Sequence, residues 1–425
     1  MLSFKILEKK IIAYLVCSIV PFLAISIFFA DLIVSTLSIF FFIYLIKQNS
    51  FFFYKNIIFV ITLFFYFLCL ISSFLSDEIL FSLKSSLPLI RIIIFIFLIS
   101  YLIQNNKFFL DIFYNFLKFT FLVITIYGLF QYIYEYTNLE SKDYYVSYVR
   151  LTLPFSDEQK IGSFLVRLYG LLLAVYSLKK NYKKSENIFL FFLSISVAVV
   201  IMLSGERSSF FLLILFFSIC AILLNFKLKF KIAFIFSALL ISILILSQNS
   251  NLSQRIIFDK NNQLNLTSNK EDLVIFTTQH TAHYLSGFKM FQDKPFIGQG
   301  PRMFRLLCNK ESFQTTVQNK KGCSSHPHNT YVQLLAEIGI VGSFLFCLIF
   351  FHVVFLFFKH FILNISLKKH TLSNYQIIIC GSVLLVVWPF APSGNFFNNW
   401  ILIIYAFPIG FYFNEFFKYS NYDNN

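Results

Sequence analysis

The chain has 425 residues, of which 58% are hydrophobic and only 13% are charged, and its mean hydropathy is +0.73. Soluble globular proteins do not have this balance, so the composition predicts an all-α polytopic membrane protein. A formal charge of +15 would suit nucleic-acid binding in a soluble protein. In a membrane protein, lysines that flank helices on the cytoplasmic side explain this charge, and we expect no nucleic-acid partner.

Apolar runs of membrane-spanning length predict about 12 helices. They cover residues 11–29, 32–46, 57–75, 88–103, 109–134, 162–178, 188–203, 209–225, 230–247, 331–358, 375–390 and 396–417. The first run follows three lysines without a small-residue cleavage pattern, so we expect no cleaved signal peptide. The predicted parts are about nine helices over 1–247, a long outer loop with short helices over 248–330, and about three helices over 331–425.

Lysine and arginine counts give the expected orientation. With the N-terminus in the cytoplasm, the cytoplasmic segments hold 17 of the 35 basic residues and the short outer segments hold 5, in agreement with the positive-inside rule. Both termini are therefore expected in the cytoplasm. The loop at 248–330 is expected on the opposite, outer face.

The arginines follow a different pattern, because none of the seven lies in a cytoplasmic segment. Those in outer loops are Arg150, Arg207, Arg255, Arg302 and Arg305, and those in the first turns of helices entered from outside are Arg91 and Arg167. The planar guanidinium grips phosphate through two parallel hydrogen bonds, so the set predicts an outer-face site for a phosphate-bearing substrate. Ordinary surface charge or lipid head-group contact is the alternative, and it suits Arg91 and Arg255 best.

The turn at 203–210 places Glu206 and Arg207 at the membrane edge between two apolar helices. Ionisable groups there are costly, and they are usually functional or paired. A local Glu206–Arg207 pair, or snorkelling of the side chains to water, is the structural alternative. Neighbouring residues on a turn pair poorly, which favours a functional role for Arg207.

The long outer loop carries a helical segment, a turn and two cysteines. His280 and His283 lie on one face of the helix predicted over 271–294 and are interpreted as solvent-facing rather than as ligands. The Gly-x-Gly at 298–300 lacks the strand and the lysine of a nucleotide loop and predicts a turn. Cys308 and Cys323 can form a disulfide if the loop faces an oxidising compartment, whereas their spacing from the following histidines matches no common zinc site.

The polar loop ends where an apolar helix begins, at His326-Pro-His328-Asn329-Thr330. Asn329 and Thr330 are suited to cap that helix. We predict that this junction is the active centre of a membrane enzyme working at the outer face of a bilayer.

Four patches resemble the bacterial O-antigen ligase and Wzy-type polymerase family. They are Arg150…Pro154-Phe-x-Asp-Glu…Gly162-Ser-Phe-Leu-x-Arg167, Ser204-Gly-Glu-Arg-Ser, Pro295-Phe-Ile-Gly-x-Gly, and His326-Pro-His-Asn-x-Tyr-x-Gln…Glu337-x-Gly-x-x-Gly342. The resemblance implies a GT-C-like glycosyltransferase that moves a glycan from undecaprenyl diphosphate to an acceptor hydroxyl at the periplasmic face of the bacterial inner membrane. The acceptor is lipid A-core for a ligase, which we favour, or another glycan for a polymerase.

The resemblance also implies roles for the polar residues. His328 is expected to take the proton of the acceptor hydroxyl, as a histidine titrating near neutrality can, and His326 to orient it or contact substrate. Fixed arginines are expected to stabilise the departing diphosphate. Arg207 is the first choice, followed by Arg150, Arg167, Arg302 and Arg305.

The absence of two motifs narrows the predicted chemistry, and two other classes of protein remain as alternatives. No Asp-x-Asp and no Walker sequence occurs, so we expect neither a metal-bound nucleotide-sugar donor nor ATP, and no other cofactor. A lipid-linked glycan transporter or flippase is the rival class, but such proteins place ionisable residues near the bilayer midplane, and only Lys118 is expected to lie deep. A binding module without catalysis is the third reading.

Overall fold

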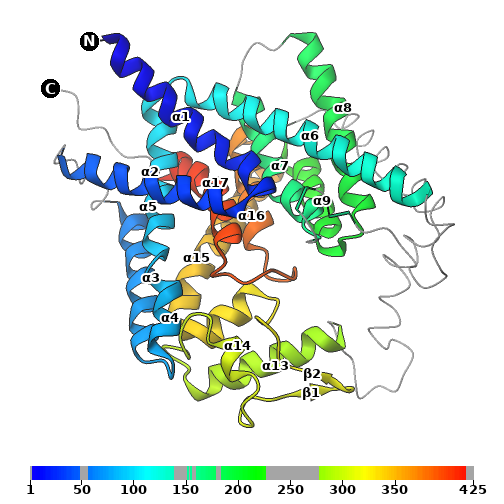
Figure 1. Cartoon of the computed structure of the whole chain (residues 1–425). Coiled ribbons are helices and arrows are strands. Elements are labelled where there is room, and N and C mark those ends of the chain that lie inside the picture. The colour runs from blue at the N-terminus through cyan, green and yellow to red at the C-terminus, as the bar shows by residue number, and fades with distance from the viewer. Residues whose placement is uncertain are drawn as a thin grey trace. The chain divides into compact units, whose positions relative to one another are not determined.

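The computed structural model describes residues 2–47, 56–137, 151–152, 154–155, 159–178, 183–225 and 277–417, and these are predominantly helical (Figure 1). The helices are α1 (Leu2–Ile25), α2 (Ile27–Lys47), α3 (Ile57–Phe74), α4 (Ile79–Ser86), α5 (Leu89–Asn105), α6 (Phe109–Thr137), α7 (Ile161–Leu178), α8 (Lys184–Leu203), α9 (Arg207–Leu223), α13 (Thr278–Asp293), α14 (Phe304–Leu307), α15 (Thr330–Leu367), α16 (Asn374–Val387) and α17 (Asn399–Phe416). Strands β1 (Thr316–Val317) and β2 (Lys320–Lys321) form an antiparallel pair.

Eleven of the expected apolar runs coincide with helices of the structure, and the run at 230–247 lies outside the described residues. Seven helical stretches in the described part are long and apolar enough to cross a membrane. They are Ile27–Lys47, Ile57–Phe74, Ile79–Asn105, Phe109–Glu135, Ile161–Leu178, Lys184–Leu203 and Thr330–Leu367. The fold is therefore that of an all-α multi-pass membrane protein, and the count of 12 remains a prediction.

The chain divides into two compact units. The first comprises the described residues within Met1–Ile27, Phe108–Asn262 and Val354–Val386, and the second those within Phe28–Lys107, Gln263–Val353 and Val387–Asn425. In the first unit, α6 packs on α1, α7 and α8. An ion pair reinforces the contact between α6 and α8: Lys118 Nζ lies 2.9 Å from Glu186 Oε1, and the hydroxyl of Tyr114 donates to the same oxygen.

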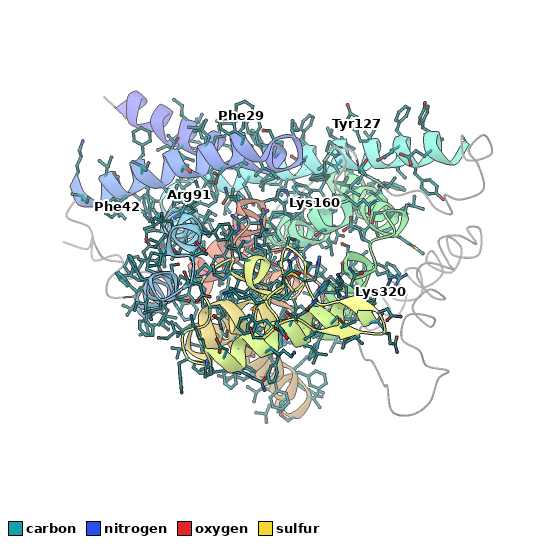
Figure 2. The ribbon with its side chains drawn as sticks, turned by 60° about the horizontal axis from the view of Figure 1, so that its bottom comes forward. Phe29, Phe42, Arg91, Tyr127, Lys160 and Lys320 are labelled. Carbon is teal, nitrogen blue, oxygen red and sulfur yellow. A yellow bond between two sulfur atoms is a disulfide. The ribbon has the colours of Figure 1, made fainter. Side chains whose placement is uncertain are left out.

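In the second unit, α17 packs closely on α5. The approach depends on Gly410, where a Cβ would lie 2.9 Å from Ile99 Cβ. Arg91 of α5 lies beside α2 (Figure 2) and forms a 2.8 Å ion pair with Asp31. This pairing gives Arg91 a structural partner within the second unit.

Helix α15 is interrupted at Gly339, whose φ of 69° and ψ of −172° are not helical. The turn at 295–300 packs into this break. Three main-chain hydrogen bonds join the two: Gln299 N–H to Ala336 O at 2.9 Å, Gly300 N–H to Glu337 O at 2.8 Å, and Ile340 N–H to Pro295 O at 2.8 Å. The break would otherwise leave these helical groups unpaired, and an unpaired buried backbone group is costly.

Glycines make this interlock, the packing of the turn at 295–300 into the break in α15, possible. Gly298 has a φ of 76°, and a Cβ there would lie 2.4 Å from the carbonyl carbon of Glu337. A Cβ on Gly339 would lie 2.3 Å from the carbonyl carbon of Phe296. Both backbones therefore approach within a distance that no larger residue permits. Two sequence patches of the family resemblance, the turn at 295–300 and the segment at 337–342, meet here as one structural feature.

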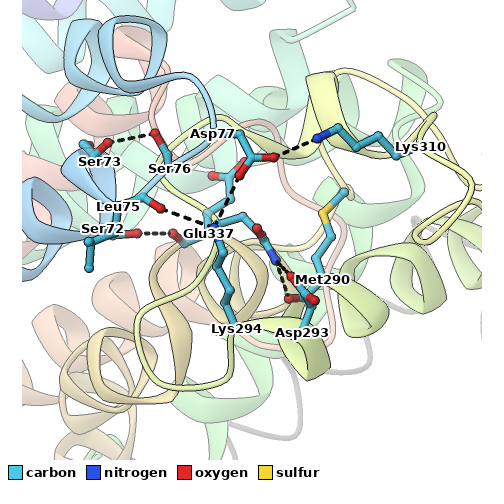
Figure 3. Close-up of polar contacts among 11 residues, drawn as sticks. Ser72, Ser73, Leu75, Ser76, Asp77, Met290, Asp293, Lys294, Lys310 and Glu337 are labelled. Atoms are coloured by element: carbon cyan, nitrogen blue, oxygen red, sulfur yellow. Dashed lines mark hydrogen bonds and ion pairs between the residues drawn. The ribbon is translucent and has the colours of Figure 1, made fainter.

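The segment between α13 and α15 is also tied to the start of the second unit (Figure 3). Asp77, in the turn between α3 and α4, accepts from Lys310 at 2.7 Å and lies 3.5 Å from Lys294. The hydroxyl of Ser72 donates to the main-chain oxygen of Glu337 at 2.8 Å. These contacts anchor the segment that leads to the histidine-bearing loop, which is the loop that carries His326 and His328.

Candidate functional site

The histidine-bearing loop is anchored where α15 begins. The side-chain oxygen of Asn329 accepts the N–H groups of Tyr331 and Val332 at 2.9 and 3.1 Å, so Asn329 caps the helix as the sequence predicted. The amide of Asn329 also donates to Pro389 O at 2.7 Å. The cap therefore connects the loop to the polar turn that precedes α17.

His328 has an unusual backbone conformation, with a φ of 59°. Residues other than glycine rarely adopt a left-handed conformation, and such strain is concentrated at functional sites. The carbonyl of His328 accepts the N–H of Ser393 at 3.0 Å. Capping at Asn329 and this hydrogen bond hold the backbone that directly follows the Cα of His328.

Three imidazoles surround that of His328. Its ring centroid lies 4.1 Å from that of His326, 5.4 Å from that of His283 and 5.6 Å from that of His280. The last two come from α13, where the side chain of Thr277 caps the helix by accepting the N–H of His280 at 3.3 Å. The interpretation of His280 and His283 as solvent-facing was wrong for His283, which is only 1% exposed.

The i, i+3 spacing was the only signal in the sequence for this pair. It shows that the two rings share a face of α13, but not what that face meets. Within the described residues, no group of three or more histidine, cysteine or carboxylate side chains has the arrangement that would hold a metal ion.

Arg305 lies beside the histidines, and Arg302 belongs to the same unit. Arg305 donates to the carbonyl of Ser325 at 3.4 Å, next to His326, whose Nδ1 is 2.9 Å from the Ser325 hydroxyl. Arg302 has a φ of 62°, and its guanidinium lies 6.0 Å from the centroid of the Phe81 ring. Two of the predicted phosphate-binding arginines thus belong to the unit that contains the histidines.

The disulfide between Cys308 and Cys323 joins these two groups of residues. It connects the end of α14, three residues after Arg305, to the loop three residues before His326. The link packs on a small core that contains Met290, Met303, Phe304, Leu307 and Phe313. The covalent bridge restricts the loop on which the histidines lie.

The histidines titrate below the near-neutral range that the sequence suggested. Burial, with repulsion from Arg305 and from His283 and His280, lowers the pKa of His326 to about 4. Burial, with repulsion from the three other imidazoles, lowers the pKa of His328 to about 3. Both rings are neutral at pH 7 and are able to accept a proton. An anion bound beside them would raise both pKa values.

A buried polar network lies one turn further along α15. The side-chain nitrogen of Gln333 donates to Glu337 Oε2 at 2.9 Å and to Asn395 Oδ1 at 3.0 Å. Glu337 is 1% exposed, and its other carboxylate oxygen accepts the N–H of Phe304 at 3.1 Å. This carboxylate positions the segment that carries Arg302 and Arg305, a role the sequence did not suggest.

The first unit holds the other predicted residues. Glu206 accepts the N–H groups of Gly162 and Ser163 at 2.7 and 2.9 Å and the hydroxyl of Ser209 at 2.9 Å, so its carboxylate caps α7. Burial raises its pKa, while the hydrogen bonds and the charge of Arg167 oppose the shift. Glu206 therefore has a helix-capping role that the sequence did not suggest.

Arg167 and Arg207 belong to the same unit, and both lie within a few residues of this cap in the sequence. Arg167 is 7% exposed and donates to the backbone oxygen of Ser163 at 3.2 Å, and Arg207 is the first residue of α9. Arg150 and Arg255 lie outside the described residues. The role of Arg207 beside His328 remains a prediction, because these residues belong to different units.

An apolar cavity of about 370 Å³ lies within the second unit, between α3, α5, α15 and α17. Its lining includes Ile61, Ile93, Ile349 and Leu402, and His352 is the one basic side chain among the described residues that line it. Such walls suit hydrocarbon and offer almost nothing to a sugar chain.

Comparison with known proteins agrees with the sequence patches. No curated protein matches the chain. Residues 189–347 match the model of the O-antigen ligase family, a stretch that contains the Glu206 turn, the turn at 295–300 and the four histidines. This segment is therefore similar to the O-antigen ligase family, the family that the sequence patches resemble.

Proposed function

We propose that the protein transfers a glycan from undecaprenyl diphosphate to an acceptor hydroxyl at the periplasmic face of the bacterial inner membrane. Ligation to lipid A-core is the first choice, and polymerisation, in which the acceptor is another lipid-linked glycan, is the second. The observation that carries the proposal is the convergence of His326 and His328 with Arg305 at the capped start of α15. Within this family, a proton acceptor beside a fixed cation is the combination that such a transfer needs.

In the proposed step, the acceptor oxygen forms a bond to C1 of the donor sugar. The bond between C1 and the diphosphate oxygen breaks, and its electron pair stays on the departing undecaprenyl diphosphate. The acceptor proton passes to the neutral imidazole of His328. Arg302 and Arg305, together with Arg207, stabilise the charge that develops on the diphosphate.

Two observations favour this class over a transporter. Lys118, the basic residue expected deep in the bilayer, is paired with Glu186 and Tyr114, which gives it a structural role. The cavity of the second unit is lined almost entirely by apolar side chains, whereas an aqueous path for a glycan needs polar walls.

A transfer assay tests the proposal. Purified full-length protein in detergent is given a pool of undecaprenyl-diphosphate glycans, lipid A-core and EDTA. We expect glycan on lipid A-core with wild-type protein, and a loss of about 10²-fold to 10⁴-fold in His328→Asn. Asn is chosen because it tolerates a left-handed backbone better than Ala, so the fold is retained while the base is removed.

Arg207→Lys and Arg305→Lys keep the charge but remove the planar fork, and we expect both to lower transfer. The matched control is His370→Gln, at an exposed position that the proposal does not use. Glycan that lengthens on its own carrier would indicate the polymerase. No transfer by wild type, or full transfer by His328→Asn, would contradict the proposed chemistry.

A further inference from the structure

The pair of histidines on α13 has no role in the chemistry so far described. His283 is 1% exposed, and neither of its ring nitrogens has a hydrogen-bond partner among the described residues. Burying an imidazole in this state costs free energy that a structural role would recover through a hydrogen bond. A buried, unpartnered polar ring 5.4 Å from His328 therefore indicates a ligand.

The groups that face the histidines indicate the charge of that ligand. From α13 come His280, His283 and Tyr284, whose ring is stacked on His280 with centroids 6.1 Å apart. The loop contributes His326, and the segment before it contributes Arg305. No carboxylate is among the charged groups that act on His326 or His328. The carboxylate of Glu337, further along α15, accepts from Gln333 and from the N–H of Phe304.

Protonation of this site is self-limiting without an anion. Burial and repulsion from neighbouring imidazoles lower the pKa values of His280, His326 and His328, so these rings resist protonation. A dianionic group among the rings removes both penalties, because it attracts the proton and accepts the hydrogen bonds that the ring nitrogens then donate.

We infer that His280 and His283 complete a four-imidazole anion site, which binds the diphosphate of a lipid-linked donor together with a proton held among His280, His283 and His326, so that His328 stays neutral. This inference rests on the proposed function for the identity of the donor. In the site, His283 donates to the diphosphate, and the shared proton offsets part of its charge before transfer begins. His280 and His283 thus act in binding the leaving group, separately from the acceptance of the acceptor proton by His328.

The test measures proton uptake on binding. The probe is a symmetrical dialkyl diphosphate diester, whose two acidic groups stay ionised at neutral pH, so any proton taken up comes to rest on the protein. Its binding to full-length protein in detergent at pH 7, with EDTA, is followed by calorimetry in two buffers of different ionisation enthalpy. We expect uptake of about one proton for each diester bound.

The variants assign the proton to the α13 pair. We expect His280→Gln and His283→Gln to bind the diester about tenfold more weakly and to take up a smaller fraction of a proton. His370→Gln, the exposed control, should behave as wild type. His280 is partly exposed, so His280→Gln remains informative if the buried substitution does not fold.

Diester binding without proton uptake, or unchanged binding by His280→Gln, would overturn the inference. Equal binding of sulfate at the same concentration would do so as well, since it would indicate general attraction of anions. The transfer assay separates the two proposals. Transfer by wild type without proton-linked binding removes only the four-imidazole site, and proton-linked binding without transfer removes only the proposed reaction.

Discussion

At the scale of single residues, the lowered pKa values of His326 and His328 predict how stability changes with pH. An unfolded histidine titrates at about 6.5, and in the folded protein the two values are about 4 and about 3. Between these limits the unfolded chain binds more protons than the folded one, so stability falls as the pH falls. We expect the midpoint of thermal unfolding in detergent to be constant above about pH 7 and to decrease from there to pH 4.

The double variant His326→Gln/His328→Gln isolates this contribution. Its unfolding midpoint should fall less steeply over the same pH range than that of wild type, because the two rings no longer take up protons on unfolding. An identical slope in both proteins would show that other groups govern the acid sensitivity.

The cap on α7 gives a second prediction at a single residue. A Cβ on Gly162 would lie 2.6 Å from the hydroxyl oxygen of Ser204 and 3.0 Å from Glu206 Oε1. Gly162→Ala must therefore displace the carboxylate that caps the helix, with a cost of about 1–3 kcal/mol for the weakened hydrogen bonds. We expect a lower thermal midpoint. Gly162→Ala/Ser204→Ala removes the closer contact and should recover part of the loss, and no recovery would place the strain elsewhere.

The four histidines show why the sequence revealed only half of the candidate site. His326 and His328 are adjacent to a helix cap and within a motif, so local pattern was sufficient. His280 and His283 are more than 40 residues earlier in the chain, and their helix gives no indication of what it packs against. Their contact with His328 is a property of the tertiary structure.

At the scale of elements, the helices followed from apolar runs, but the break in α15 did not. An isolated glycine in an apolar run does not predict the end of a helix, so the run at 331–358 was predicted to form one continuous helix. The partner of the break is the turn at 295–300, which reads only as a turn. The sequence shows the turn and the glycine of the helix separately. That the two form hydrogen bonds with each other is shown only by the tertiary structure.

The interlock predicts different outcomes for two glycines three residues apart. Gly339→Ala adds the cost of a positive-φ conformation with ψ near 180°, which is essentially confined to glycine, about 1–3 kcal/mol, to a collision with the main chain of Phe296. Gly342→Ala meets only the side chain of Ile338, which can move, and its φ is not in the left-handed region. We expect Gly339→Ala to reduce the yield of folded protein and the transfer activity sharply, and Gly342→Ala to have a much smaller effect.

Folded yield is measured by size-exclusion chromatography in detergent, and activity by the transfer assay. If Gly339→Ala matched Gly342→Ala in both, the break at Gly339 would not be needed for folding or for the candidate site. A loss of activity at normal yield would instead show that the turn at 295–300 positions Arg302 and Arg305.

At the scale of the whole molecule, membrane character follows from composition, and orientation is predicted from the distribution of lysine. The structure adds suitable reporter positions. Lys320 is exposed on β2 beside α13 (Figure 2) in the loop predicted to face the periplasm. Lys369 is exposed between α15 and α16, in a segment predicted to face the cytoplasm.

The orientation is tested with single reporter cysteines. The described free cysteines, Cys17, Cys69, Cys220, Cys347 and Cys380, are replaced by Ala or Ser, and the Cys308–Cys323 disulfide is kept. In intact cells whose outer membrane has been made permeable, we expect a membrane-impermeant maleimide to label Lys320→Cys and not Lys369→Cys. Lysis should then expose Lys369→Cys. The reverse pattern would place the histidines in the cytoplasm, away from a periplasmic acceptor, and would contradict the proposed transfer at its most basic requirement.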